Sequence, residues 1–144
     1  MSTDTIKITF DVEPTGVPLT ITAVLDNNVV WEKLINEKCT AEIVCNDSDA
    51  IEHTLVFKMS GKQPQDTELD ANGNIVKDST IKFSNIVADD IEITQTLVDT
   101  GSYHHNFNGN GADTIENFYG IMGCNGSVVF KFTTPFYLWL LENM

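Results

Sequence analysis

Alternating acidic and amide side chains in the segment 66–78 are the best candidate for metal-ion chemistry in this sequence. Just before Gly73, four oxygen-bearing residues occupy alternate positions: Asp66, Glu68, Asp70 and Asn72. Calcium prefers six to eight oxygen ligands, and alternating carboxylates converge on one ion when the backbone curls, as in the first half of an EF-hand loop. The position of that loop's bidentate Glu holds Ser79. The segment therefore predicts either a calcium site or a solvated hairpin with its turn at Asn72-Gly73.

Catalytic patterns are weak elsewhere in the chain. The pair His104-His105 has carboxylates nearby, but adjacent residues of a strand point to opposite faces and do not easily share one metal ion. No Ser lies in a Gly-x-Ser-x-Gly turn, and Cys124 has no identifiable base partner. No phosphate-binding loop is present. The residues predict a protein that is not an enzyme.

Alternating apolar and polar residues predict strands over most of the chain. The central pair is expected in the segment Ile51–Ile93, on both sides of the acidic loop. The full set of expected strands covers residues 5–12, 19–25, 29–35, 40–45, 51–59, 81–84, 91–98, 102–107, 118–122 and 128–132. Many short strands spaced by turn signals favour an all-β, antiparallel β-sandwich, with a jelly roll preferred over an immunoglobulin-like Greek key. We expect residues 1–144 to form a single sandwich domain.

The end of the chain differs from the rest because large apolar residues run consecutively there. Thr134-Pro135 predicts a short C-terminal helix with Thr134 as its cap, although a final edge strand is the alternative. The six residues must be covered either by the sandwich itself or by a neighbouring subunit, and they are our predicted interface: Phe136, Tyr137, Leu138, Trp139, Leu140 and Leu141.

Composition excludes several classes of partner. The formal net charge of −13 comes from 21 acidic and 8 basic residues, so repulsion disfavours binding to nucleic acid. The longest apolar run is too short to span a bilayer, and the polar start MSTDTIKITF predicts no signal peptide.

Three cysteines without close spacing favour buried thiols over disulfides: Cys39, Cys45 and Cys124. The aromatic residues are expected mostly in the core, with sugar-stacking platforms as the alternative.

Several stretches resemble a known group of proteins. HTLVFKMSGK, DANGNIVKDSTIKF and the closing FYGIMGCNGSVVFKFTTPFYLWLLEN are similar to small structural proteins of tailed phages, in particular contractile-tailed phages of marine cyanobacteria. The resemblance covers roughly the last two-thirds of the chain. Such proteins resemble, more weakly, calcium-dependent carbohydrate modules of the xylan-binding type.

The resemblance implies a virion component of a tail, baseplate, fibre or capsid decoration. The expected function is thus non-enzymatic assembly through contacts with other virion proteins or with copies of itself, in a virion made in the host cytoplasm. The alternative is a calcium-assisted carbohydrate-binding module that recognises a host surface glycan. No cofactor other than calcium is suggested.

Overall fold

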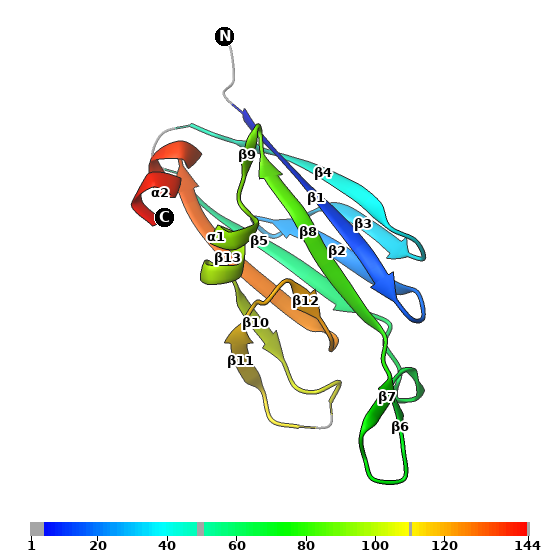
Figure 1. The fold of residues 1–144 in the computed structure, drawn as a ribbon. Helices are drawn as coiled ribbons and strands as arrows, with labels where there is room; N and C mark the ends of the chain where they lie inside the picture. Colours follow the sequence, from blue (N-terminus) through cyan, green and yellow to red (C-terminus); the bar gives the residue numbers. More distant parts are fainter. Residues whose placement is uncertain (1–4, 49–50, 110, 144) are drawn as a thin grey trace.

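Two antiparallel β-sheets face each other across one hydrophobic core in the computed structural model, which describes residues 5–48, 51–109 and 111–143 (Figure 1). The first sheet has the order β12-β8-β1-β4, with β9 also paired to β8. Its strands are β1 (Thr5–Thr15), β4 (Cys39–Asn46), β8 (Thr80–Ala88), β9 (Ile91–Glu92) and β12 (Ile121–Met122).

The second sheet has the order β11-β10-β13-β5-β2-β3. Its strands are β2 (Leu19–Leu25), β3 (Asn28–Ile35), β5 (Ile51–Ser60), β10 (Ser102–His105), β11 (Thr114–Asn117) and β13 (Gly126–Thr134). The predicted all-β antiparallel sandwich of jelly-roll-like form is confirmed. Sequence did not determine the strand order, which joins β5 to both β2 and β13.

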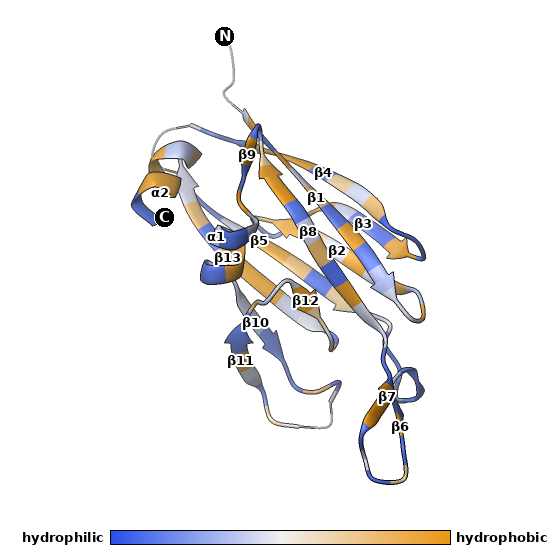
Figure 2. Cartoon of the chain, viewed as in Figure 1, coloured by the Kyte–Doolittle hydropathy of each residue, from blue (hydrophilic) through white to orange (hydrophobic). Residues whose placement is uncertain are grey.

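The core follows from the period-two pattern that marked the strands. In β1, Ile6, Ile8, Phe10 and Val12 are all buried, while intervening residues such as Lys7 face outward. Alternating hydrophobic and hydrophilic bands along β1 and β8 show the same pattern (Figure 2). The ring of Phe10 lies 4.8 Å from that of Phe57 across the sandwich. Truncation of such a buried Phe to Ala costs about 3–5 kcal/mol of stability.

A small hairpin lies outside the two main sheets. After β5 a 3₁₀ helix, η1 (Pro64–Asp66), leads into β6 (Glu68–Leu69) and β7 (Ile75–Lys77), which pair with each other and, within the described residues, with no other strand. The hairpin projects from one end of the sandwich, and its β7 strand is hydrophobic although it is exposed (Figures 1 and 2). The predicted hairpin interpretation of the acidic loop is therefore correct for the backbone.

The strand predicted over 91–98 is wrong beyond Glu92. Residues 94–100 form the helix α1 (Thr94–Thr100). The apolar residues Ile93 and Leu97 are four positions apart, which places both on one side of a helix, and both are buried. The strand predicted over 118–122 is also shorter than expected, because Gly120 adopts φ 91° and only Ile121–Met122 pair with β8.

The chain ends in the helix α2 (Phe136–Asn143), so the helical alternative is correct. The prediction that Thr134 caps this helix is wrong. Thr134 donates its hydroxyl to the carbonyl oxygens of Ser48 and Ile51, and the Asp47 carboxylate accepts from the amide of Phe136 at 2.7 Å. A carboxylate at a helix N-terminus also interacts favourably with the helix dipole.

Candidate functional site

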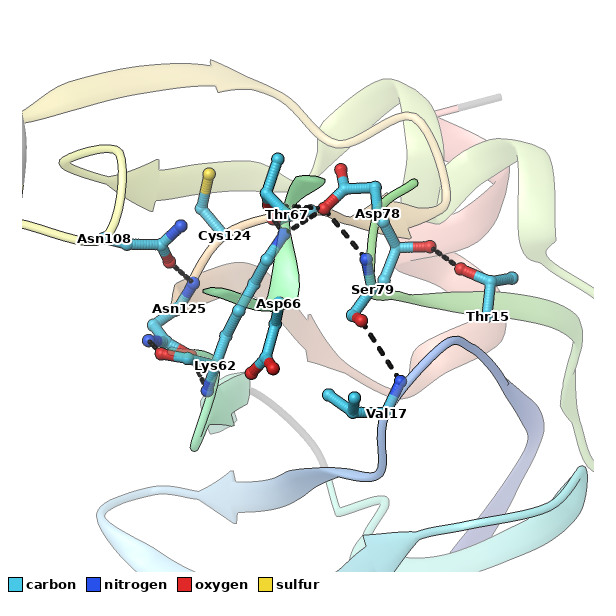
Figure 3. Close-up of polar contacts among 12 residues, drawn as sticks. Thr15, Val17, Lys62, Asp66, Thr67, Asp78, Ser79, Asn108, Cys124 and Asn125 are labelled. Carbon is cyan, nitrogen blue, oxygen red and sulfur yellow. Dashed lines mark hydrogen bonds and ion pairs between the residues drawn. The ribbon is translucent and has the colours of Figure 1, made fainter. Parts of the chain in front are cut away.

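Polar side chains connect four chain segments at one end of the sandwich, which we call the loop end. It comprises the β1–β2 turn (residues 16–18), the segment 61–79, the start of the β10–β11 loop (106–109) and the turn 123–126. The close-up in Figure 3 shows side chains from these segments pointing toward one another. Helix α2 lies at the opposite end of β13.

Lys62 is the hub of the loop end. Its side chain is only 2% exposed, and its ammonium group donates to Asp78 Oδ1 and to the carbonyl of Gly123, both at 2.6 Å. A buried charge is tolerated only when it is paired and hydrogen-bonded, as it is here. The backbone of Lys62 is tied as well, because Asn125 accepts from its amide and donates to its carbonyl oxygen.

Asp78 receives several hydrogen bonds on one oxygen. Its Oδ1 accepts from Lys62 Nζ, from the Thr67 hydroxyl at 2.7 Å and from the Ser79 amide at 2.8 Å. Burial raises the pKa of Asp78, but these hydrogen bonds and the Lys62 charge outweigh it, so the pKa lies below its ordinary value. Asp78 is therefore held as a carboxylate.

The β1–β2 turn is attached through Ser79. The Ser79 hydroxyl accepts from the amide of Val17 at 3.1 Å. Gly16, with φ 116°, packs so closely on Ser79 that a Cβ at position 16 would overlap the Ser79 side chain. Glycine is required there for both reasons.

The turn 123–126 is held from the sandwich side by Tyr103. Its buried hydroxyl accepts from the amide of Cys124 at 2.8 Å and donates to the carbonyl of the same residue. Burial raises the pKa of the Tyr103 phenol, which stays protonated and able to donate. On the other side, Asn108 accepts from the amide of Asn125 at 2.7 Å.

A cavity of about 330 Å³, the hairpin cavity, lies between the β6–β7 hairpin and these held segments. Its polar lining includes Lys62, Thr67 and Asp78. Its apolar lining includes Pro64, Leu69, Ile75 and Phe107. Leu69, Ile75 and Phe107 are 58%, 61% and 47% exposed, so large apolar side chains form an accessible rim over a charged floor.

A second cavity of about 550 Å³, the β10–β11 cavity, adjoins the same segments. Most of the residues that line it have polar side chains: His104, His105, Asn106, Asp113, Thr114 and Asn125, together with Ile115 and Gly126. Amide, imidazole and carboxylate groups of this kind form hydrogen bonds with polyhydroxylated ligands. Both cavities are bordered by 104–108 and 123–126, so one set of loops shapes them.

Two of the four predicted calcium ligands, Asp66 and Asp70, accept hydrogen bonds from backbone amides of local turns. Asp66 accepts from the amide of Gln63 at 2.8 Å, and its carboxylate does not point toward Asp78 (Figure 3). Asp70 Oδ1 accepts from the amides of Asn72 and Asn74, and these contacts hold the pKa of Asp70 below its ordinary value. Glu68 is exposed in β6. Within residues 5–48, 51–109 and 111–143, no three or more His, Cys, Asp or Glu side chains group in a way that could hold a metal ion. The calcium site at Asp66, Glu68, Asp70 and Asn72 stays a prediction.

The histidines take separate roles. His104 is exposed, whereas His105 is buried and contacts Glu116 Oε2 through Nε2 at 2.7 Å. His53 is buried near the α2 end, with Nδ1 2.6 Å from Asp26 Oδ2 and Nε2 2.9 Å from the Asn46 carbonyl oxygen. Their side chains support the fold or line a cavity.

All three cysteines are free thiols. Burial, followed by the nearby charges of Asp47 and Asp26, raises the pKa of Cys45 to about 12. Burial also raises the pKa of Cys124. Neither thiol is activated as a nucleophile, because the thiolate is the reactive form.

The predicted C-terminal interface is divided by the helix. Phe136, Trp139 and Leu140 are buried in the sandwich core. Tyr137, Leu138 and Leu141 are 39%, 59% and 73% exposed, so only these three remain available to a partner. No helix of the described residues has the length and apolar character needed to cross a membrane.

Sequence reasoning missed the hub residues Lys62 and Asp78 and the exposed ring of Phe107. Lys62 follows a strand and Gly61, as solvent-exposed lysines commonly do, and Asp78 was one acid among many in its loop. The apolar residues Leu69 and Ile75 in an otherwise polar loop were the one available signal of an apolar rim.

Comparisons with known proteins find matches among solved structures, at low sequence identity and with TM-scores below 0.5. No protein-family model matches the chain, and no curated protein matches it. A structure of vCBM60 in complex with galactobiose has a TM-score of 0.44 and 14% identity, covering 86% of this chain and 96% of the other. A selenomethionine form of vCBM60, described with two families of calcium-dependent carbohydrate binding modules, has a TM-score of 0.47 and 13% identity, covering 87% and 89%.

Proposed function

We propose that the protein is a non-catalytic module that binds a glycan at the loop end. The observation that carries the proposal is the pair of adjoining cavities at that end, one lined mostly by residues with polar side chains and one with an apolar rim over a charged floor. Sugars present hydroxyl groups and apolar C–H faces together, and binding sites for them combine hydrogen-bonding side chains with apolar or aromatic surfaces. Phe107 supplies the exposed ring.

The net charge narrows the class of glycan. At a formal charge of −13 the protein repels anionic polysaccharides at moderate ionic strength, so we expect a neutral glycan. We propose that this glycan belongs to a host surface.

A glycan array followed by calorimetric titration tests this function. We expect at least one neutral saccharide to bind and sulfated or uronic acid polymers not to bind. Titrations with millimolar calcium and with a chelator test the calcium-assisted form of the prediction. Absence of binding to every neutral saccharide would refute the proposed function.

A second candidate is the assembly role in a phage particle that the resemblance implies. The observation that favours it is the exposed apolar face of α2, formed by Tyr137, Leu138 and Leu141. Large apolar side chains grouped on one surface element are typical of protein interfaces.

Light scattering after size-exclusion chromatography tests the assembly role. We expect the wild-type protein to form a multimer, and the double substitution Leu138→Ser and Leu141→Ser to shift it toward the monomer. A wild-type protein that remains monomeric at high micromolar concentration would contradict self-assembly through this face.

A further inference from the structure

We infer that Lys62 and Asp78 form the floor of the glycan site and bind the hydroxyl groups of a neutral sugar directly, without a bridging metal ion. This inference rests on the proposed function and deepens it, because it places the sugar in the hairpin cavity and names the groups that contact it.

One donor and one acceptor remain on this pair. An ammonium group carries three N–H donors, and the hydrogen bonds of the described residues use two of those on Lys62, to Asp78 Oδ1 and to Gly123. Within the described residues, Oδ1 accepts every hydrogen bond to the Asp78 carboxylate, so Oδ2 remains as an acceptor without a partner. Both residues line the hairpin cavity. We assign the remaining N–H and the remaining oxygen to a sugar inside that cavity.

A sugar matches this arrangement. A hydroxyl group both donates and accepts a hydrogen bond, so one hydroxyl, or two on neighbouring carbons, can accept from Lys62 Nζ and donate to Asp78 Oδ2. Hydrogen bonds to charged groups are stronger than those between neutral groups. Above the pair, Leu69, Ile75 and Phe107 offer apolar contacts to the C–H face of the ring.

The ammonium group occupies the place that a bridging cation would need. It lies 2.6 Å from both Asp78 Oδ1 and the Gly123 carbonyl oxygen, two oxygens that could otherwise coordinate a metal. A second cation at these oxygens would be repelled by the buried positive charge.

The test is an NMR titration of ¹⁵N-labelled protein in chelator with the methyl glycosides of glucose, galactose, mannose and xylose. We expect a binding glycoside to shift the amide signals of Lys62, Gly123 and Phe107. Millimolar calcium is expected to leave the dissociation constant unchanged. A deoxy analogue lacking the contacting hydroxyl is expected to bind about tenfold more weakly or worse.

Protein variants give an independent check. Phe107→Ala alters the exposed rim without touching the buried pair, and we expect it to weaken binding several-fold. Val44→Ala, at an exposed position of β4, is the matched control and should bind as the wild type does.

The outcomes separate the two proposals. Three results would overturn this inference while the proposed function stands. They are a shift confined to the amide signals of residues that line the β10–β11 cavity, binding that requires calcium, and an equal dissociation constant for every deoxy analogue. If neither these glycosides nor any neutral saccharide on the array binds, the proposed function fails and the inference fails with it.

Discussion

Individual side chains at the loop end act mainly by satisfying buried polar groups of other segments. Tyr103 is the clearest case, since its hydroxyl serves both the amide and the carbonyl of Cys124. Lys62 acts in the same way on Gly123 and Asp78. Leaving such groups without partners costs more than the hydrogen bonds contribute when present, so these few residues stabilise the loops that border both cavities.

Tyr103→Phe is expected to lower the free energy of unfolding by about 1–3 kcal/mol, because it leaves two polar groups of Cys124 unpaired. Urea unfolding measures the loss, and hydrogen exchange should show faster exchange at residues 123–126. Tyr119→Phe is the matched control, since Tyr119 is 74% exposed, and it should leave both measurements unchanged. Equal effects of the two substitutions would contradict the assigned role of Tyr103.

At the scale of elements, α2 closes one end of the sandwich while the loop end stays open. The ring of Trp139 lies 5.4 Å from that of Phe130 on β13 and 5.7 Å from that of Phe136. Asp47, between β4 and β5, holds the start of the helix. The helix is therefore part of the core on one face and available to a partner on the other.

Trp139→Ala is expected to destabilise the fold by about 3–5 kcal/mol, because it removes a buried aromatic side chain and leaves a cavity. Leu141→Ala, at a position 73% exposed, should change stability by less than about 0.5 kcal/mol. Chemical denaturation of both variants provides the comparison. If Trp139→Ala lowers the free energy of unfolding as little as Leu141→Ala does, α2 does not pack on β13 as described.

For the whole molecule, the distribution of carboxylates links stability to pH. Asp78 at the loop end and Asp26 near the α2 end both have lowered pKa values. For Asp26, burial raises the pKa, but hydrogen bonds from His53 and from the Thr54 amide lower it by more, so the net shift is downward. A carboxylate with a lowered folded-state pKa contributes stability above its unfolded pKa, about 3.9, and this contribution is lost as pH falls through the folded-state pKa.

The free energy of unfolding is therefore expected to fall as pH decreases from 6 toward 3. Asp78→Asn should be less stable than the wild type at pH 6, and the difference between the two should shrink as pH is lowered. Glu42→Gln removes one charge from the exposed outer face of β4 and controls for net charge. A pH-independent difference between Asp78→Asn and the wild type would show that charge on Asp78 does not stabilise the fold.

Sequence alone determined the sandwich and most of its strands, because burial of one face imposes a period of two that is visible in residues such as Ile6, Ile8 and Phe10. It also indicated the hairpin at Asn72-Gly73 and the helical end. The strand predicted over 91–98 was wrong for the residues of α1. Ile93 and Leu97 have a helical spacing, but the polar residues between them made this spacing difficult to recognise.

The tertiary structure alone decided the candidate site. Lys62, Asp78, Gly123 and Asn125 meet only because β5, β8 and β13 end or begin at the same end of the sandwich, and strand order is not encoded in local pattern. The helix cap shows the same limit, since Asp47 lies 89 positions from the amide that it caps. Local periodicity reports which face of a strand is buried, whereas long-range partners depend on how the two sheets are joined.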